Sequence, residues 1–276
     1  MANPLRRPVR FGTAELVPDP WRPTGRILTV DDVPQSYVDL ADPSHLQMPY
    51  SIWIAQTINH HWPDDTPIAA VHVGGGACTL PRYLATTRPG STQTVFELDA
   101  LLVDLLREPL GLDDLPGVRL EVGDGRSGLV SCPDHSADLV VLDAFRGGDT
   151  VTDLATLEFV DEVFRVLRPR GLYTANLWAA GDLTFLLRAF AAVTAVFPYV
   201  LAFAEPSVFM KWRPGNVVIV ASTVDLVNWT ATAPGPVTCL TADELAEVCG
   251  TAAPLTEGDP VLEAPARVDP WARLRN

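Results

Sequence analysis

The segment Ile68-Ala69-Ala70-Val71-His72-Val73-Gly74-Gly75-Gly76 decides the fold, because an apolar run of strand length ends in three glycines. Leu80–Thr86 then predict a helix. In doubly wound α/β folds such a turn lies at the carboxyl edge of the sheet, where glycine lets a ligand approach the backbone. Thr79 stands where G-x-G-x-x-G needs its third glycine, which disfavours dinucleotide binding. A purely structural turn is the alternative.

Strand and helix patterns alternate from this turn to the end of the apolar region. Between the predicted strands, apolar residues recur at helical spacing, as at Leu101, Leu102, Leu105 and Leu106. Such alternation requires crossover connections, so the sequence predicts an α/β fold: a seven-stranded, mostly parallel, Rossmann-like sheet of the AdoMet-methyltransferase type with helices on both faces. The seven expected strands are Ile68–Val73, Val95–Leu98, Val118–Val122, Asp138–Asp143, Leu172–Leu177, Tyr199–Phe203 and Asn216–Ala221.

We expect three regions along the chain. Residues 1–48 are rich in proline and contain β-prone pieces, so they are predicted to form an N-terminal extension with a small β-sheet. Residues 49–222 are predicted to form the Rossmann-like, nucleoside-binding catalytic domain. Residues 223–276 are predicted to be a tail with one short helix, Ala242–Cys249.

Carboxylates lie at the ends of three of the predicted strands or just past them. Glu97 lies 21 residues past Gly76, where an acidic side chain can accept hydrogen bonds from both ribose hydroxyls. Asp124 lies within Gly123-Asp124-Gly125 and could accept from the exocyclic amine of a purine, although an Asx turn uses the same sequence. Because these groups follow successive strands, we interpret them together as a nucleoside site.

Asp143 is the best catalytic candidate. It ends the predicted strand Asp138–Asp143, where its carboxylate could deprotonate an attacking amine or pair with a cationic sulfonium. Capping of the next loop is the alternative. That loop, 144–153, is long enough to close over a substrate.

Composition narrows the function classes. The net charge of −14 is spread along the chain without a basic stripe, so we expect no nucleic-acid partner. An acidic field favours a cationic substrate, although solubility alone explains it. Four cysteines without a C-x-x-C pair suit the cytoplasm, and no apolar run reaches the length of a membrane span. The histidines lack metal-ligand spacing, so no metal is assigned.

Taken together, these residues resemble the spermidine synthase family of aminopropyltransferases, which share the fold of AdoMet-dependent methyltransferases. The resemblance runs from about residue 35 to about residue 221. It rests on Gln35, Tyr50-Ser51-Ile52-Trp53-Ile54-Ala55, Val73-Gly74-Gly75-Gly76 followed by Arg82, Phe96-Glu97-Leu98-Asp99, Gly123-Asp124-Gly125, Asp138–Asp143 and Leu157–Gly171.

The resemblance implies a role for each matching residue. Tyr50 would line the channel for the amine, and Asp143 would help to deprotonate it. The co-substrate would be decarboxylated AdoMet or AdoMet, the acceptor a small molecule such as a polyamine, and the protein a homodimer. Residues implied to bind the co-substrate are Gln35, Gly74, Gly75, Gly76, Glu97, Asp124 and Gly125.

Three positions depart from the family's pattern. Ala77 replaces an aspartate that holds the amino group of decarboxylated AdoMet, and Ser51 replaces a histidine. Without that aspartate, the carboxylate of intact AdoMet is no longer repelled. Arg146 replaces a second aspartate, and an arginine pointing into the crevice would repel a diamine and attract an anion.

Three functions stay open at this point. The first is transfer of an aminopropyl group to an amine, which the ordered match favours. The second is methylation of a small molecule by AdoMet, which Ala77 and Arg146 favour. The third is a binding or assembly protein that keeps the fold without its chemistry.

Overall fold

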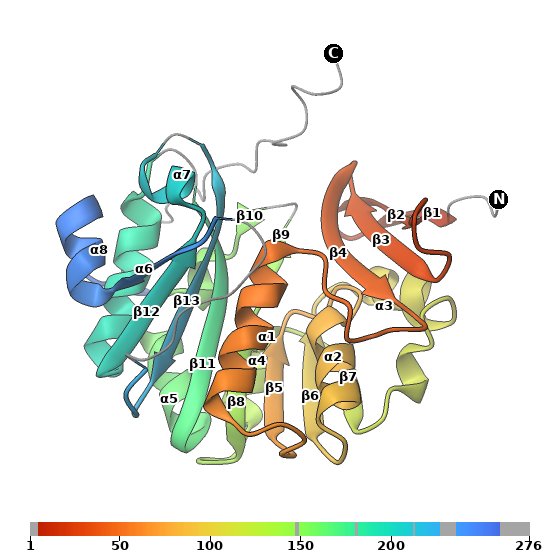
Figure 1. Ribbon diagram of the computed structural model, residues 1–276, viewed down its shortest axis with the longest axis horizontal. Helices are drawn as coiled ribbons and strands as arrows, with labels where there is room; N and C mark the ends of the chain where they lie inside the picture. The colour runs from red at the N-terminus through yellow and green to blue at the C-terminus, as the bar shows by residue number, and fades with distance from the viewer. Residues whose placement is uncertain (1–4, 147–148, 180–181, 212, 227–235, 260–276) are drawn as a thin grey trace.

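The computed structural model describes residues 5–146, 149–179, 182–211, 213–226 and 236–259, and a single large sheet forms its centre (Figure 1). Five neighbouring strands pair in parallel, and the last three pair antiparallel. This confirms the α/β fold with a mostly parallel sheet. Across the sheet the strands are β14 (Thr238–Thr241), β12 (Tyr199–Ala204), β13 (Gly215–Ser222), β11 (Leu167–Ala179), β8 (Ala137–Leu142), β5 (Ala69–Val73), β6 (Thr92–Glu97) and β7 (Val118–Val122).

The strand order reverses beside β5. The chain adds β6 and β7 on one side of β5 and then returns to place β8 on the other side. In open α/β sheets the crevice at such a reversal is where ligands bind, at the carboxyl ends of the strands. The turns after β5 and β8 contain Gly74 and Asp143, so the topology brings the glycine turn and the catalytic candidate to one crevice.

Seven strands were expected, and the large sheet has eight among the described residues, because β14 from the C-terminal segment joins it. It pairs antiparallel with β12, from Leu201↔Thr241 to Ala204↔Thr238. The four residues of β14 show no apolar alternation, so their sequence hardly predicts a strand. They form one because the edge of β12 offers unpaired backbone groups. The predicted helix follows as α8 (Ala242–Cys249), which starts with a capping box between Thr241 and Glu244.

Helices cover both faces of the sheet, because alternate residues of a buried strand point to opposite sides. Leu139 and Val141 of β8 pack with α1 (Pro49–His61) and α2 (Thr79–Thr87) on the face nearer the viewer in Figure 1. Val140 and Leu142 pack with helices on the other face. These are α4 (Gly125–Ser131), α5 (Leu157–Val166) and α6 (Thr184–Val196). Within the described ranges, every helix is too short or too polar to span a bilayer.

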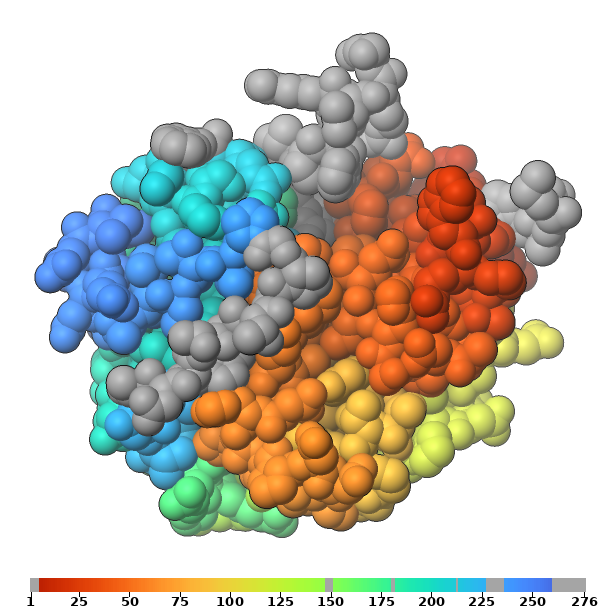
Figure 2. Space-filling view, in the orientation of Figure 1, coloured from red at the N-terminus to blue at the C-terminus, as the bar shows by residue number. Residues whose placement is uncertain are grey.

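A separate antiparallel sheet precedes the large one. Its strands are β1 (Leu5–Val9), β2 (Gly12–Pro18), β3 (Gly25–Val30) and β4 (Val33–Asp39), paired in chain order. Its inner residues share an apolar cluster with Leu105 and Leu106 of α3 (Ala100–Arg107). Figure 2 shows this sheet, in red, at one end of the molecule and α8, in blue, at the other. The small sheet therefore covers the crevice from the side of β6 and α3. Shorter elements are η1 (Leu112–Asp114) and α7 (Pro206–Phe209).

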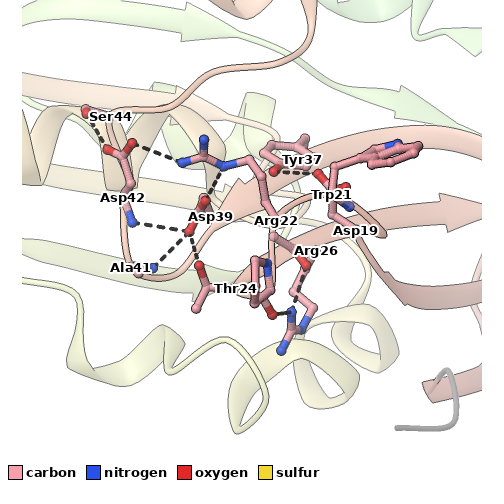
Figure 3. A network of polar contacts seen from close by, with 12 residues as sticks. Asp19, Trp21, Arg22, Thr24, Arg26, Tyr37, Asp39, Ala41, Asp42 and Ser44 are labelled. Carbon is pink, nitrogen blue, oxygen red and sulfur yellow. Dashed lines mark hydrogen bonds and ion pairs between the residues drawn. The ribbon is translucent and has the colours of Figure 1, made fainter. Parts of the chain in front are cut away.

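Polar contacts hold the loop between β2 and β3 against β4 (Figure 3). Asp19 accepts hydrogen bonds from the Trp21 amide at 2.8 Å and the Tyr37 hydroxyl at 2.9 Å. Arg22 Nε lies 2.6 Å from Asp39 Oδ2. Burial, together with the bond to Asp19, raises the pKa of Tyr37 to about 12. These contacts fix β4, the strand that carries Gln35 towards the crevice.

Candidate functional site

A cavity of about 290 Å³ lies at the carboxyl ends of β5, β6 and β8, under the N-terminal sheet. Its wall combines backbone amides, carboxylates and apolar side chains. Eight of the nine residues expected at the site line this cavity, and Tyr50 does not. The eight are Gln35, Gly74, Gly75, Gly76, Glu97, Asp124, Gly125 and Asp143.

The glycine turn after β5 is required by backbone geometry. Gly74 has a φ of +98°, and a Cβ there would lie 2.2 Å from the carbonyl oxygen of Asp143. The Gly74 amide donates to Phe96 O at 2.9 Å, and the Asp143 amide donates to Val73 O at 2.9 Å. The turn therefore lets the ends of β6 and β8 approach β5, which no side chain at position 74 would permit.

Glu97 is held by the turn that it faces. Its Oε2 accepts hydrogen bonds from the amides of Gly75 at 2.9 Å and Gly76 at 3.0 Å, and its Oε1 accepts from the Asp99 amide at 2.9 Å. Three backbone donors thus orient the carboxylate at the cavity wall. Each carboxylate oxygen has more than one lone pair, so Glu97 can still accept from hydroxyl groups of a ligand.

Asp124 is the N-cap of α4. Its Oδ1 accepts from both the amide and the hydroxyl of Ser127, each at 2.8 Å. The local side-chain hydrogen bond expected of an Asx turn is therefore present, here as a helix cap. It uses one oxygen, and Oδ2 makes no hydrogen bond to the described residues, so the side chain can cap the helix and also accept from a ligand.

Asp143 receives a side-chain hydrogen bond from the neighbouring strand. Asn176 Nδ2 donates to its Oδ1 at 2.9 Å, and Asn216 Nδ2 donates to Asn176 Oδ1 at 2.9 Å. Asn176 is only 1% exposed. Sequence reasoning missed this amide, although a lone asparagine in the apolar run Leu172–Leu177 was a visible signal.

Tyr50 lies beside the cavity in the first turn of α1. It is 6% exposed, and its hydroxyl lies 3.4 Å from the carbonyl oxygen of Gln35, whose side chain lines the cavity. Ser51, one of the positions that depart from the family pattern, donates to Met48 O at 2.8 Å within the same turn. Ala77, another such position, is 1% exposed and packs in the apolar cluster beneath the N-terminal sheet. Tyr50 therefore contacts Gln35, a residue of the cavity wall, without lining the cavity itself.

The segment after Asp143 forms the remaining wall. Strands β9 (Phe145–Arg146) and β10 (Asp149–Thr150) pair as a short hairpin, followed by η2 (Thr152–Leu154). Residues 147 and 148 of the predicted lid loop lie outside the described residues. Arg126 Nη1 donates to Asp153 O at 2.8 Å, and its other nitrogen pairs with Glu257. The sequence did not predict Phe11 and Arg126 at the cavity, because they come from segments distant in the chain.

The described residues contain no cluster of three or more histidine, cysteine or acidic side chains that could hold a metal ion.

No family model matches the chain. In sequence it is 26% identical over 185 residues to a polyamine aminopropyltransferase of Chromobacterium violaceum, over 65% of this chain and 69% of the relative. It superposes on a probable spermidine synthase from Corynebacterium glutamicum with a TM-score of 0.84 and 29% identity, over 94% of this chain and 98% of that one. A spermidine synthase in complex with the transition state analogue AdoDATO has a TM-score of 0.56 and 16% identity, over 79% and 73%, which shows a shared fold. The chain resembles spermidine synthases in sequence and in fold.

Proposed function

We propose that this chain is a transferase that binds an S-adenosyl nucleoside and transfers the aminopropyl group of decarboxylated AdoMet to an amine. One observation carries the proposal: a glycine turn, a strand-end carboxylate held by three amides and a second carboxylate held by Asn176 all line one cavity. The similarity to a polyamine aminopropyltransferase and a probable spermidine synthase supports it.

The wall of the cavity fits an adenosyl ligand. Glu97 presents acceptors suited to ribose hydroxyls, and Asp124 Oδ2 presents one suited to an exocyclic amine. The glycine turn presents backbone without side chains at the cavity wall, so a ligand can approach it closely. Gln35 and the apolar side chains of the N-terminal sheet would cover the ligand from above.

Asp143 would accept the proton that the reaction releases. When bound, the donor would supply a carbon attached to a cationic sulfonium. An amine nitrogen forms a bond to that carbon while the carbon–sulfur bond breaks and its electron pair stays on sulfur, which yields neutral methylthioadenosine. The nitrogen then carries one proton too many, and a carboxylate at the cavity wall can take it. Asn176 would keep the accepting oxygen aimed.

A direct assay tests this proposal. Purified protein is incubated with decarboxylated AdoMet and a panel of amines, and release of methylthioadenosine is measured by chromatography. We expect release that depends on the amine and falls by about 100-fold or more in Asp143→Asn, within the range that general-base catalysis contributes. No release with any amine from folded protein would refute aminopropyl transfer.

Methyl transfer from intact AdoMet is the second candidate, and the setting of Ala77 favours it. Its apolar side chain is buried under the N-terminal sheet, so position 77 offers no negative charge to repel the carboxylate of AdoMet. Calorimetric titration separates the two candidates. Tighter binding of decarboxylated AdoMet supports aminopropyl transfer, and tighter binding of AdoMet with methylation of a small molecule supports the alternative. Absence of binding by both would favour a non-catalytic protein.

Other expectations remain proposals. A small-molecule acceptor such as a polyamine, a homodimer, a cytoplasmic location and the absence of nucleic-acid or membrane partners follow from composition and from the family resemblance. Tyr50 remains a proposed contributor to the acceptor side through its contact with Gln35.

A further inference from the structure

Arg146 brings a cation into the wall of the cavity. It lies on β9, three residues after Asp143, and its backbone is held opposite Asp149 in the short hairpin. Its guanidinium carbon lies 5.8 Å from the centre of the Phe11 ring, which comes from the turn between β1 and β2. Both residues line the cavity. The side chain therefore extends from the hairpin towards the N-terminal sheet.

The two cavity arginines differ in what they contact. Arg126 is occupied by Asp153 O and the carboxylate of Glu257. Among the residues whose side chains the structure describes, which do not include 149 and 150, Arg146 makes no hydrogen bond or ion pair. Its guanidinium carbon lies over the Phe11 ring, and an aromatic ring is not an oxygen acceptor, so the planar fork of N–H donors can still bind a ligand. Those donors match the two oxygens of a carboxylate.

Asp143 and Arg146 bring opposite charges to the wall of one cavity. Three residues of extended chain span at most about 11 Å, so one small molecule can reach both side chains. A diamine that approached Asp143 would meet the positive charge of Arg146 with its second ammonium group, which is unfavourable. A molecule with a nitrogen at one end and a carboxylate at the other would match both.

We propose that Arg146 is a carboxylate-binding residue of this cavity and that the substrate reaching it is zwitterionic, with an amine or sulfonium near Asp143 and a carboxylate at Arg146. The carboxylate has two possible sources: the methionine end of intact AdoMet, or an amino acid that serves as acceptor. The inference rests on the proposed function, because it assigns the substrate class of the same site.

The test uses probes that differ only by a carboxylate. The donors are AdoMet and decarboxylated AdoMet, compared by calorimetry. The acceptors are ornithine and 1,4-diaminobutane, which is ornithine without its carboxylate, compared by methylthioadenosine release. In the wild type we expect at least about a 10-fold preference for the carboxylated member of one pair, the size expected of a hydrogen bond to a charged group. Preference within the donor pair identifies AdoMet as the source, and preference within the acceptor pair identifies the amino acid.

Variants assign the preference to Arg146. Arg146→Gln should abolish it, Arg146→Glu should reverse it, and Arg146→Lys should keep part of it. Arg10→Gln is the matched control, because the guanidinium carbon of Arg10 lies 5.2 Å from the centre of the same ring but Arg10 does not line the cavity. It should leave the preference unchanged. Circular dichroism confirms that each variant is folded.

The outcomes separate the two proposals. If methylthioadenosine is released and neither pair shows a preference that Arg146→Gln removes, the transferase proposal stands and the role of Arg146 is refuted. If no acceptor reacts, aminopropyl transfer is refuted, and the donor titration alone decides the role of Arg146. A donor preference that persists in Arg146→Gln would overturn that role in either case.

Discussion

The side-chain amide of Asn176 donates to Oδ1 of Asp143 across 2.9 Å, and its oxygen accepts from Asn216. The second bond fixes which end of the Asn176 amide faces Asp143. Asn176 lies on β11, the strand beside β8, and is almost fully buried. The carboxylate is therefore aimed by a side chain from a neighbouring strand, and strands hold site residues more precisely than loops do.

Replacing Asn176 should impair turnover more than donor binding. Asn176→Leu removes the donor at similar volume, and we expect kcat to fall by about 10- to 100-fold, as when a catalytic group is misplaced by about 1 Å. Steady-state kinetics and calorimetry measure turnover and donor binding. Asn216→Leu, one residue further away, should cost less; an equal loss of kcat and donor affinity in both variants would indicate a structural role.

Glu97 should govern donor affinity. Glu97→Gln keeps the size but replaces one acceptor oxygen with a donor, so a backbone amide or a ligand hydroxyl loses its partner. We expect the Kd for the preferred donor to rise by about 10-fold or more, the loss expected from removing a hydrogen bond to a charged group. Glu121→Gln on the neighbouring strand β7 is the control, because Glu121 pairs with Arg119 and does not line the cavity. An unchanged Kd in Glu97→Gln would remove Glu97 from the site.

Replacing Thr174 with valine should stabilise the folded protein. Its hydroxyl oxygen is fully buried in β11 and has no hydrogen-bond partner among the described residues. Thr174→Val removes an unpaired polar group at constant shape, so the free energy of unfolding should rise by about 1 kcal/mol. Thr57→Val is the matched comparison, since the buried Thr57 hydroxyl donates to Trp53 O at 2.8 Å. Urea denaturation should show the opposite sign for Thr57→Val, and equal effects of the two substitutions would contradict the assignment.

His72 should make stability depend on pH. Burial lowers its pKa from 6.5 to about 4, against the effect of its hydrogen bond to Gln93. Between these values the unfolded chain binds a proton that the folded protein does not. The contribution of His72 to the free energy of unfolding is therefore fully present above pH 6.5 and is lost as the pH falls towards 4. From pH 6.5 to 5 the loss should be about 2 kcal/mol.

Denaturation of His72→Gln provides the check. A glutamine does not titrate, so the difference in unfolding free energy between pH 7 and pH 5 should shrink by about the same 2 kcal/mol relative to the wild type. If the two proteins lose stability in parallel over this range, His72 is not the titrating group.

Local patterns were enough to predict most of the framework. The apolar run before Gly74, the helical spacing of the leucines in α3 and the helix α8 all depend on neighbours within a few residues. Glu97, Asp124 and Asp143 could be grouped because parallel strands end at one edge of the sheet, so their proximity follows from the fold class. The positive φ of Gly74 follows from the same close approach of strands.

The sequence by itself therefore determined the fold class and the carboxylates that share the cavity, because both arise from short-range periodicity and from the rule that places strand ends together. Only the tertiary structure decided that β14 completes the sheet, that Tyr50 reaches the cavity through the Gln35 backbone, that Asn176 aims Asp143 and that Arg146 meets Phe11. These contacts join segments that are distant in the chain. Their formation depends on how strands and loops pack in three dimensions, and no local pattern encodes that packing.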